Sequence, residues 1–196
     1  MKPIHNLLAE IDVQWKPLGG EPIRLRLIGS AALMLQTDYE RGTKDADILE
    51  ADELTPAVRA QLLALAGPKS VLYGKYRMYI EVVLKAILFW PQSPSFHPIP
   101  VLTLKNFTVE VLDPTDIVVS KLKRLNQNDI DDIRAMAGKN LLDHKKLVSR
   151  FESAVDRFSA DARAEDLPAY IRNLNRIERD FLGVPESRIE LPEWMQ

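Results

Sequence analysis

The sequence changes character at Asp113-Pro114, and this change limits the possible folds more than any other feature. Before it, extended stretches rich in β-branched and aromatic residues alternate with short helical segments, whereas only helical patterns follow it. Strands first and helices later are typical of an α+β protein. We therefore expect a mixed β-sheet flanked by helices in residues 1–112, and a helical C-terminal region in residues 113–196 that packs on it.

Cap and breaker residues place the individual elements. Helices are expected over residues 4–15, after Gly29-Ser30, from Thr55-Pro56 to Gly67, from Pro114, and over 129–137, 144–158 and 168–182. Extended stretches are expected over residues 24–28, 45–49, 71–73, 78–88 and 101–112. The proline-dense segment from Pro91 to Pro100 is expected to run as a loop or an edge.

Charge and cysteine content exclude several classes of function. The 196 residues carry 26 basic and 28 acidic side chains, so no global field attracts the chain to nucleic acid or to an anionic membrane. The absence of cysteine excludes disulfides, thiolate nucleophiles and cysteine zinc sites. The N-terminus lacks the apolar core of a signal peptide, and no apolar run reaches membrane-spanning length. We expect a cytoplasmic protein with no membrane partner.

A tight turn at Gly29-Ser30 joins a predicted strand to a predicted helix. Backbone N–H groups at such a turn can bind phosphate, and glycine permits close approach because it has no side chain. Ser30 adds a hydroxyl donor. A Gly-Ser pair after a strand is usually only a turn, so the residues that follow decide its meaning.

Asp45 and Asp47 follow on the next predicted strand. Side chains two residues apart on a strand point to the same face, with Cα atoms roughly 6 to 7 Å apart, so both carboxylates can share a pair of metal ions. Magnesium prefers such hard oxygen ligands. A third carboxylate is expected from a neighbouring strand, and Glu81 is favoured over Glu110, which is better interpreted as a solvent-facing strand residue.

In combination, the Gly-Ser turn, the helix and the Asp-x-Asp strand resemble the signature of the polymerase-β-like nucleotidyltransferase superfamily. The resemblance is carried by LIGSAALML (27–35), RGTKDADILE (41–50) and DPTDIVVSKLKRLNQNDIDDIRAM (113–136). The chain is most similar to the small prokaryotic branch, which contains minimal enzymes and toxins of the AbiEii type. The resemblance covers roughly residues 23–150, and it implies a nucleotidyltransferase-like catalytic domain in residues 1–112.

The resemblance also implies roles for individual residues. It makes Asp45, Asp47 and Glu81 the catalytic metal ligands, with Mg²⁺ as the cofactor, two ions expected and Mn²⁺ as an alternative. It implies contacts to the nucleotide or its phosphates from Gly29, Ser30, Lys121, Asp129 and Asp132. Lys44 is added as a phosphate contact because it lies beside the Asp-x-Asp motif.

Four of these phosphate contacts have a purely structural alternative. Lys121 can equally lie on a solvated helix surface, and Asp129 and Asp132 can be acids that stabilise a helix start. Arg41 and Lys44 flank the Asp-x-Asp motif and could reach a triphosphate, although charges in such a connection usually face water.

We therefore expect metal-dependent transfer of a nucleoside monophosphate from a nucleoside triphosphate to a hydroxyl of RNA, a protein or a small molecule. Transfer RNA and a protein are the acceptors considered, and the AbiEii resemblance adds a cognate antitoxin as a partner. One alternative is a noncatalytic nucleotide- or RNA-binding module of the same fold. Another is a structural interaction protein, in which Asp45 and Asp47 are only solvated strand residues.

Overall fold

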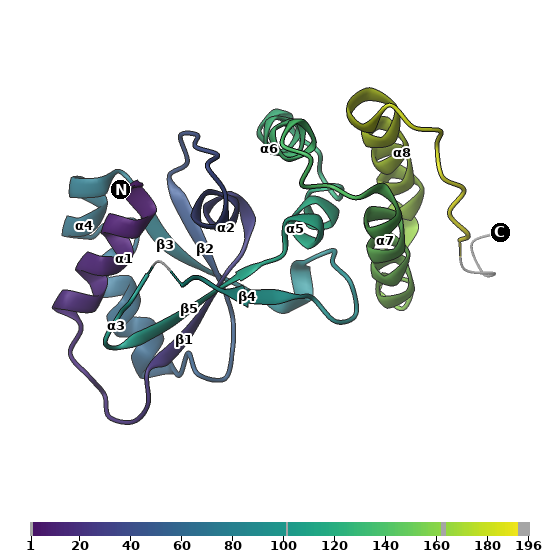
Figure 1. Cartoon of the computed structure of the whole chain (residues 1–196). Coiled ribbons are helices and arrows are strands. Elements are labelled where there is room, and N and C mark those ends of the chain that lie inside the picture. Colours follow the sequence, from purple (N-terminus) through teal and green to yellow (C-terminus); the bar gives the residue numbers. More distant parts are fainter. Residues whose placement is uncertain (1, 101, 162–163, 192–196) are drawn as a thin grey trace. The chain divides into compact units, whose positions relative to one another are not determined.

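The computed structural model describes residues 2–100, 102–161 and 164–191, and the chain divides into two compact units. The first unit comprises Met1–Ile87 and Phe96–Leu112, and the second comprises Leu88–Ser95 and Asp113–Gln196. Figure 1 shows the strands and their helices, followed along the chain by helices alone. The predicted fold class, α+β with a mixed sheet and C-terminal helices, is confirmed.

The first unit is built on a five-stranded sheet with the strand order β3-β2-β1-β5-β4. Its strands are β1 Ile23–Leu27, β2 Asp45–Leu49, β3 Tyr79–Val83, β4 Phe96–Pro98 and β5 Phe107–Leu112. β1 runs parallel to β5 and β2 runs parallel to β3, while β1 with β2 and β4 with β5 are antiparallel. The sheet is therefore mixed, and the proline-rich segment supplies its edge strand β4.

Alternation along the strands gives the sheet one apolar and one polar face. Leu25, Leu27, Ala46 and Ile48 are fully buried on the apolar face. Four helices precede β3: α1 Pro3–Gln14, α2 Gly29–Gln36, α3 Pro56–Ala66 and α4 Val71–Tyr76. Helix α2 contacts β2 and β5, and α3 and α4 contact β3. The charged residues of β1 and β2 alternate with the buried ones, so they lie on the opposite face.

The expectation of an extended stretch at residues 71–73 is wrong, because these residues begin α4. The Ser70 hydroxyl accepts a hydrogen bond from the Tyr73 backbone N–H at 3.1 Å, which caps the first turn. Burial of Leu72, at 2% exposed, then overrides the strand preference of its neighbours. The expected strands 78–88 and 101–112 are shorter than predicted, at Tyr79–Val83 and Phe107–Leu112.

The second unit consists of helices and the segment Leu88–Ser95. Its helices are α5 Pro114–Lys121, α6 Gln127–Gly138, α7 His144–Phe158 and α8 Leu167–Ile177, with a 3-10 turn at Ala164–Asp166 and a π-helical turn at Glu178–Leu182. The predicted start of α5 is confirmed, because the Asp113 carboxylate accepts a hydrogen bond from Thr115 N–H at 2.8 Å. The fully buried Phe89 ring packs edge-on against Phe151, Phe158 and Tyr170.

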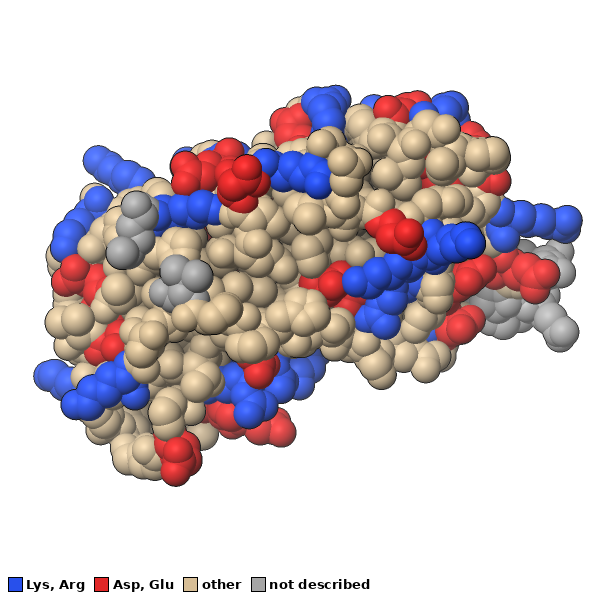
Figure 2. All heavy atoms as spheres, viewed as in Figure 1, with Lys and Arg blue, Asp and Glu red and all other residues tan. Residues whose placement is uncertain are grey.

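No helix in the described ranges is both long enough and apolar enough to cross a membrane. On the face shown in Figure 2, lysine and arginine side chains lie among aspartate and glutamate side chains. This mixture agrees with the near balance of charge in the sequence, whose formal net charge is −2.

Candidate active site

Three carboxylates of the first unit converge at the start of β2 and the middle of β3, and we call them the acidic site: Asp45, Asp47 and Glu81. In the parallel pairing of β2 with β3, Asp45 lies opposite Tyr79 and Asp47 lies opposite Glu81. One oxygen of each carboxylate lies within 4.8 Å of those of the other two. Asp45 and Asp47 are partly exposed and Glu81 is exposed, so a ligand can reach all three.

Glu110, the competing candidate for the third carboxylate, has different neighbours. It lies on β5 opposite Arg26, and its Oε2 is 3.1 Å from the Arg26 Nε. Its other oxygen is 3.6 Å from the Arg24 Nε. The structure therefore brings Glu81 to the two aspartates and pairs Glu110 with arginines.

The Gly29-Ser30 turn lies directly against Asp47. Ile28 N–H donates a hydrogen bond to the Asp47 carbonyl at 3.0 Å, and Gly29 then begins α2 with φ at +64°. A Cβ atom on residue 29 would lie 2.9 Å from Asp47 Oδ2, closer than such contacts allow. The left-handed backbone favours glycine at this position, and a larger residue would displace the Asp47 carboxylate.

The segment between α2 and β2 contributes two contacts that the sequence prediction missed. Arg41 Nη2 donates to Ser30 Oγ at 2.6 Å, and Thr43 Oγ1 donates to Asp45 Oδ1 at 2.6 Å. No local signal in the sequence marks the Arg41 contact, because that contact depends on the segment folding back on Ser30. Lys44, which we predicted as a phosphate contact, has an exposed side chain, and its carbonyl accepts from Tyr79 N–H at 2.8 Å.

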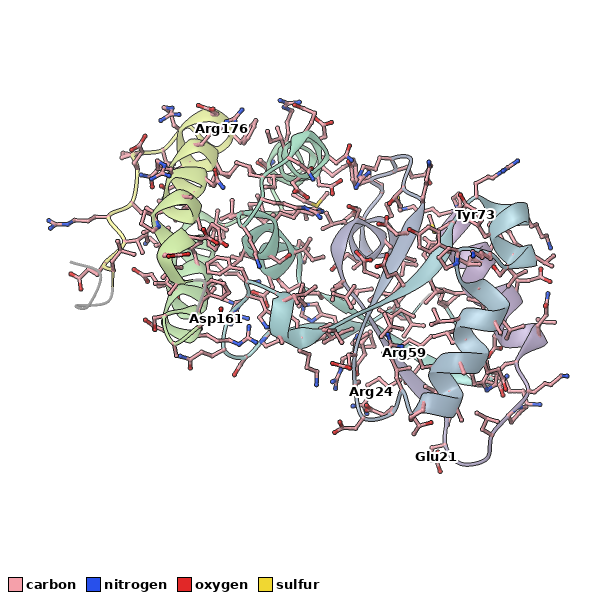
Figure 3. The ribbon with its side chains drawn as sticks, turned by 180° about the vertical axis from the view of Figure 1, so that it is seen from behind. Glu21, Arg24, Arg59, Tyr73, Asp161 and Arg176 are labelled. Carbon is pink, nitrogen blue, oxygen red and sulfur yellow. The ribbon has the colours of Figure 1, made fainter. Side chains whose placement is uncertain are left out.

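Tyr79 lies opposite Asp45, and the charges of the acidic site affect its pKa. Its ring packs edge-on against Tyr73 of α4, which Figure 3 labels, with the ring centroids 5.5 Å apart. Burial raises the pKa of the Tyr79 hydroxyl, and the negative charges of Asp45, Glu81 and Asp47 raise it further. The carboxylates thus create a negative field that disfavours any additional anion unless a cation is bound.

The family of the chain follows from a comparison with family models. The model described as "Nucleotidyltransferase of unknown function (DUF6036)" matches residues 6–180. The chain belongs to this nucleotidyltransferase family. No curated protein and no solved structure matches the chain. The match supports the predicted nucleotidyltransferase resemblance, but it does not single out the AbiEii-type toxins.

The donor set of the acidic site in this family member fits magnesium. It offers carboxylate oxygens only, with no histidine or cysteine among its members, and hard oxygen ligands are those that Mg²⁺ prefers. Two strands hold the three groups at fixed register, so the carboxylates are placed before any ion arrives.

The remaining predicted contacts lie in the second unit: Lys121, Asp129 and Asp132. The exposed Arg124 pairs with Asp129, and we call these four residues the buried ion cluster. The Lys121 ammonium is 3.0 Å from Asp129 Oδ1 and 2.8 Å from Asp132 Oδ2. Lys121 is 5% exposed and both aspartates are fully buried. The structure thus brings these three predicted residues together as partners of one another.

Asp129 also pairs with Arg124 and caps the start of α6. Arg124 binds both of its carboxylate oxygens, at 2.8 and 3.2 Å, and the same carboxylate caps Asn126 N–H at the start of α6. Burial opposes its ionisation, but the hydrogen bonds and charges of Arg124 and Lys121 outweigh burial and lower the pKa of Asp129. The cluster joins the end of α5 to the first turns of α6.

Proposed function

We propose that the chain is a magnesium-dependent enzyme that transfers a nucleoside monophosphate from a nucleoside triphosphate to a hydroxyl group. The observation that carries the proposal is the acidic site, whose three oxygens lie within 4.8 Å of one another beside the Gly29-Ser30 turn. The family of the chain supports the same class of reaction. Magnesium held by the three carboxylates would neutralise the triphosphate and polarise its oxygens.

The residues of the chain have separate tasks in this reaction. Gly29 leaves space for the phosphates next to Asp47, and Ser30 offers a hydroxyl at the same turn. Glu81 receives the proton of the acceptor hydroxyl, because it is exposed and accepts no hydrogen bond from any residue in the described ranges. The acceptor oxygen forms a bond to the α-phosphorus, the bond from that phosphorus to the bridging oxygen breaks, and pyrophosphate leaves.

The acceptor is an RNA, a protein or a small molecule, with transfer RNA as the first to test. The resemblance to AbiEii-type toxins further motivates the hypothesis that the enzyme arrests growth and that a cognate antitoxin controls it. The hypothesis is tested by expressing the wild type and the Asp45→Asn/Asp47→Asn variant in separate cell cultures and comparing their growth. Equal growth of both cultures would argue against the toxin hypothesis while leaving the transfer reaction intact.

The transfer reaction is tested with purified protein, magnesium and each of the four nucleoside triphosphates, with transfer RNA or a cell lysate as the acceptor. Each nucleotide is supplied with the label either on the α- or on the γ-phosphate. We expect the α-label alone to reach the acceptor, and we expect the Asp45→Asn/Asp47→Asn variant to transfer none. Manganese in place of magnesium is expected to support the reaction as well.

The other outcomes lead to different conclusions. Transfer of the γ-label would replace nucleotidyl transfer by phosphoryl transfer. A folded wild-type protein that binds triphosphate with magnesium but transfers no label to any acceptor would favour a noncatalytic nucleotide- or RNA-binding module. Absence of any magnesium-dependent nucleotide binding would leave an interaction protein as the better interpretation.

A further inference from the structure

The segment that joins α2 to β2, residues 37–44, returns two side chains to the site. The Arg41 guanidinium reaches the Ser30 hydroxyl at 2.6 Å, and the Thr43 hydroxyl reaches the Asp45 carboxylate at the same distance. One contact ends on the turn and the other on a carboxylate. Residues 37–44 therefore line the site as well as joining α2 to β2.

Arg41 forms a second hydrogen bond through its guanidinium. Its Nη1 donates to the Gly42 carbonyl at 3.0 Å, and its side chain borders a cavity of about 190 Å³ that Met34 and Met78 also line. Immobilising a long side chain costs conformational entropy when a ligand binds. An arginine that the fold already holds loses less of that freedom, so its position is suited to binding.

The neighbouring cation, Lys44, does not share this position. Strand alternation directs its side chain to the face opposite Asp45, and its carbonyl is already part of the ladder with β3. Its exposed ammonium is thus the weaker candidate for a phosphate contact.

A guanidinium has five N–H donors in a rigid planar fork that matches the geometry of phosphate oxygens, so it can hold a serine hydroxyl and a phosphate at the same time. We infer that Arg41 binds the β- and γ-phosphates of the nucleoside triphosphate, and hence the pyrophosphate that leaves. This inference rests on the proposed function. It assigns to Arg41 the stabilisation of a leaving group whose charge the acidic site would otherwise repel.

Binding of two probes tests the inference without requiring knowledge of the base or the acceptor. Isothermal titration with magnesium alone measures the acidic site, and titration with inorganic pyrophosphate in excess magnesium measures the phosphate site. For Arg41→Gln we expect pyrophosphate affinity to fall about 10- to 100-fold, the range for loss of charge-assisted hydrogen bonds. Affinity for magnesium alone is expected to remain within about twofold, because no carboxylate has been changed.

Two further variants complete the experiment. Arg41→Lys keeps the charge but not the fork, and it should restore part of the pyrophosphate affinity. Arg59→Gln is the matched control, since Arg59 is a partly exposed arginine of the same unit on α3 (Figure 3) and should bind both probes as the wild type does.

Several results would overturn the inference. Unchanged pyrophosphate affinity in Arg41→Gln, or a loss seen in Lys44→Gln instead, removes Arg41 as the phosphate ligand and leaves the proposed function standing. Equal losses for magnesium and pyrophosphate would mean that Arg41 only maintains the shape of the site. Wild-type protein that binds neither probe would overturn the proposed function together with this inference.

Discussion

The acidic site and the buried ion cluster both gather carboxylates, but they differ in what balances the charge. In the buried ion cluster, lysine and arginine supply the balance from within the second unit, and both aspartates are fully buried. In the acidic site, neither Asp45 nor Glu81 forms an ion pair with a lysine or arginine of the described chain. The first arrangement is complete in itself, whereas the second is suited to a cation from outside.

This difference distinguishes acids that stabilise the fold from acids that bind a ligand. A carboxylate whose charge is balanced inside the fold stabilises the fold, and its removal should be seen in the free energy of unfolding. Asp45 and Glu81 form no such ion pair in the described chain and repel the acids beside them, so their removal should be seen in ligand binding. The following predictions test that division, beginning with the largest expected effect.

Lys121→Met should destabilise the protein most. It leaves Asp132 and Asp129 buried without their ammonium partner, and breaking a buried ion pair in this way costs about 3–5 kcal/mol. Denaturant titration would measure the loss in the free energy of unfolding. Lys145→Met, which removes an exposed lysine of the same unit, should change it by less than about 0.5 kcal/mol. Equal values for the two variants would contradict the structural role of Lys121.

Gly29→Ala should affect both stability and magnesium affinity. The left-handed backbone, with φ at +64°, costs a non-glycine residue about 1–2 kcal/mol. The new Cβ would lie 2.9 Å from Asp47 Oδ2 and would therefore displace that oxygen. Gly74→Ala is the control, because nothing lies within 4 Å of its Cβ position in α4, so the helix should gain about 0.5–1 kcal/mol. Thermal unfolding with and without magnesium separates the two effects. Unaltered magnesium binding in Gly29→Ala would disconnect the turn from the carboxylates.

Glu81→Gln should change the free energy of unfolding in the opposite direction to Lys121→Met when no metal is present. It removes one of two like charges that face each other between β2 and β3, and such pairs cost up to about 1 kcal/mol. The variant should therefore unfold at a slightly higher temperature than the wild type in a chelator. Excess magnesium should reverse the order, because it binds and stabilises only the wild type. A variant that is less stable than the wild type in the chelator would show that Glu81 is a structural acid.

Glu10 offers an intermediate case, an acid that is paired but not deeply buried. Lys75, Gln14 and Tyr76 donate hydrogen bonds to it, in that order of influence, and lower its pKa from 4.5 to about 2. Because the folded pKa is the lower one, the stabilisation is complete above about pH 4.5 and is lost as pH falls towards 2.

The corresponding measurement is the melting temperature of Glu10→Gln as a function of pH. The variant should melt slightly below the wild type at pH 7, and the difference should vanish near pH 2. Asp52→Asn, a change at an exposed acid of the same unit, is the control and should show no such pH dependence. A constant difference across the range would mean that packing, and not charge, accounts for the effect.

Local patterns were sufficient to predict much of the first unit. The two-residue spacing of Asp45 and Asp47 placed them on one face of β2, and the Gly29-Ser30 break separated β1 from α2. Glu81 was favoured because its strand was otherwise nearly free of acids, and the register of β2 with β3 then brought it opposite Asp47. That register is a pairing over long separation in sequence, and it could not be read from either strand alone.

Other features depended on contacts that no local pattern encodes. A lysine on a helix has the same sequence appearance whether it is solvated or buried, so the partners of Lys121 could not be chosen. The helix at Val71–Tyr76 depends on the Ser70 cap and on burial of Leu72. Arg41 was set aside as a linker charge, because nothing local shows that its segment folds back on Ser30.

The assignment of Leu88–Ser95 to the second unit has a practical consequence for genetic dissection of this protein. The chain leaves the first unit at residue 87, returns to it at residue 96 and leaves it again after residue 112. A stop codon after Leu112 would therefore produce a fragment that still carries Phe89 but none of the three rings around it. Such a fragment would expose an aromatic side chain that is fully buried in the whole protein, and it would be prone to aggregate. Dissecting this protein thus calls for point substitutions in the whole chain, since a single truncation damages both halves.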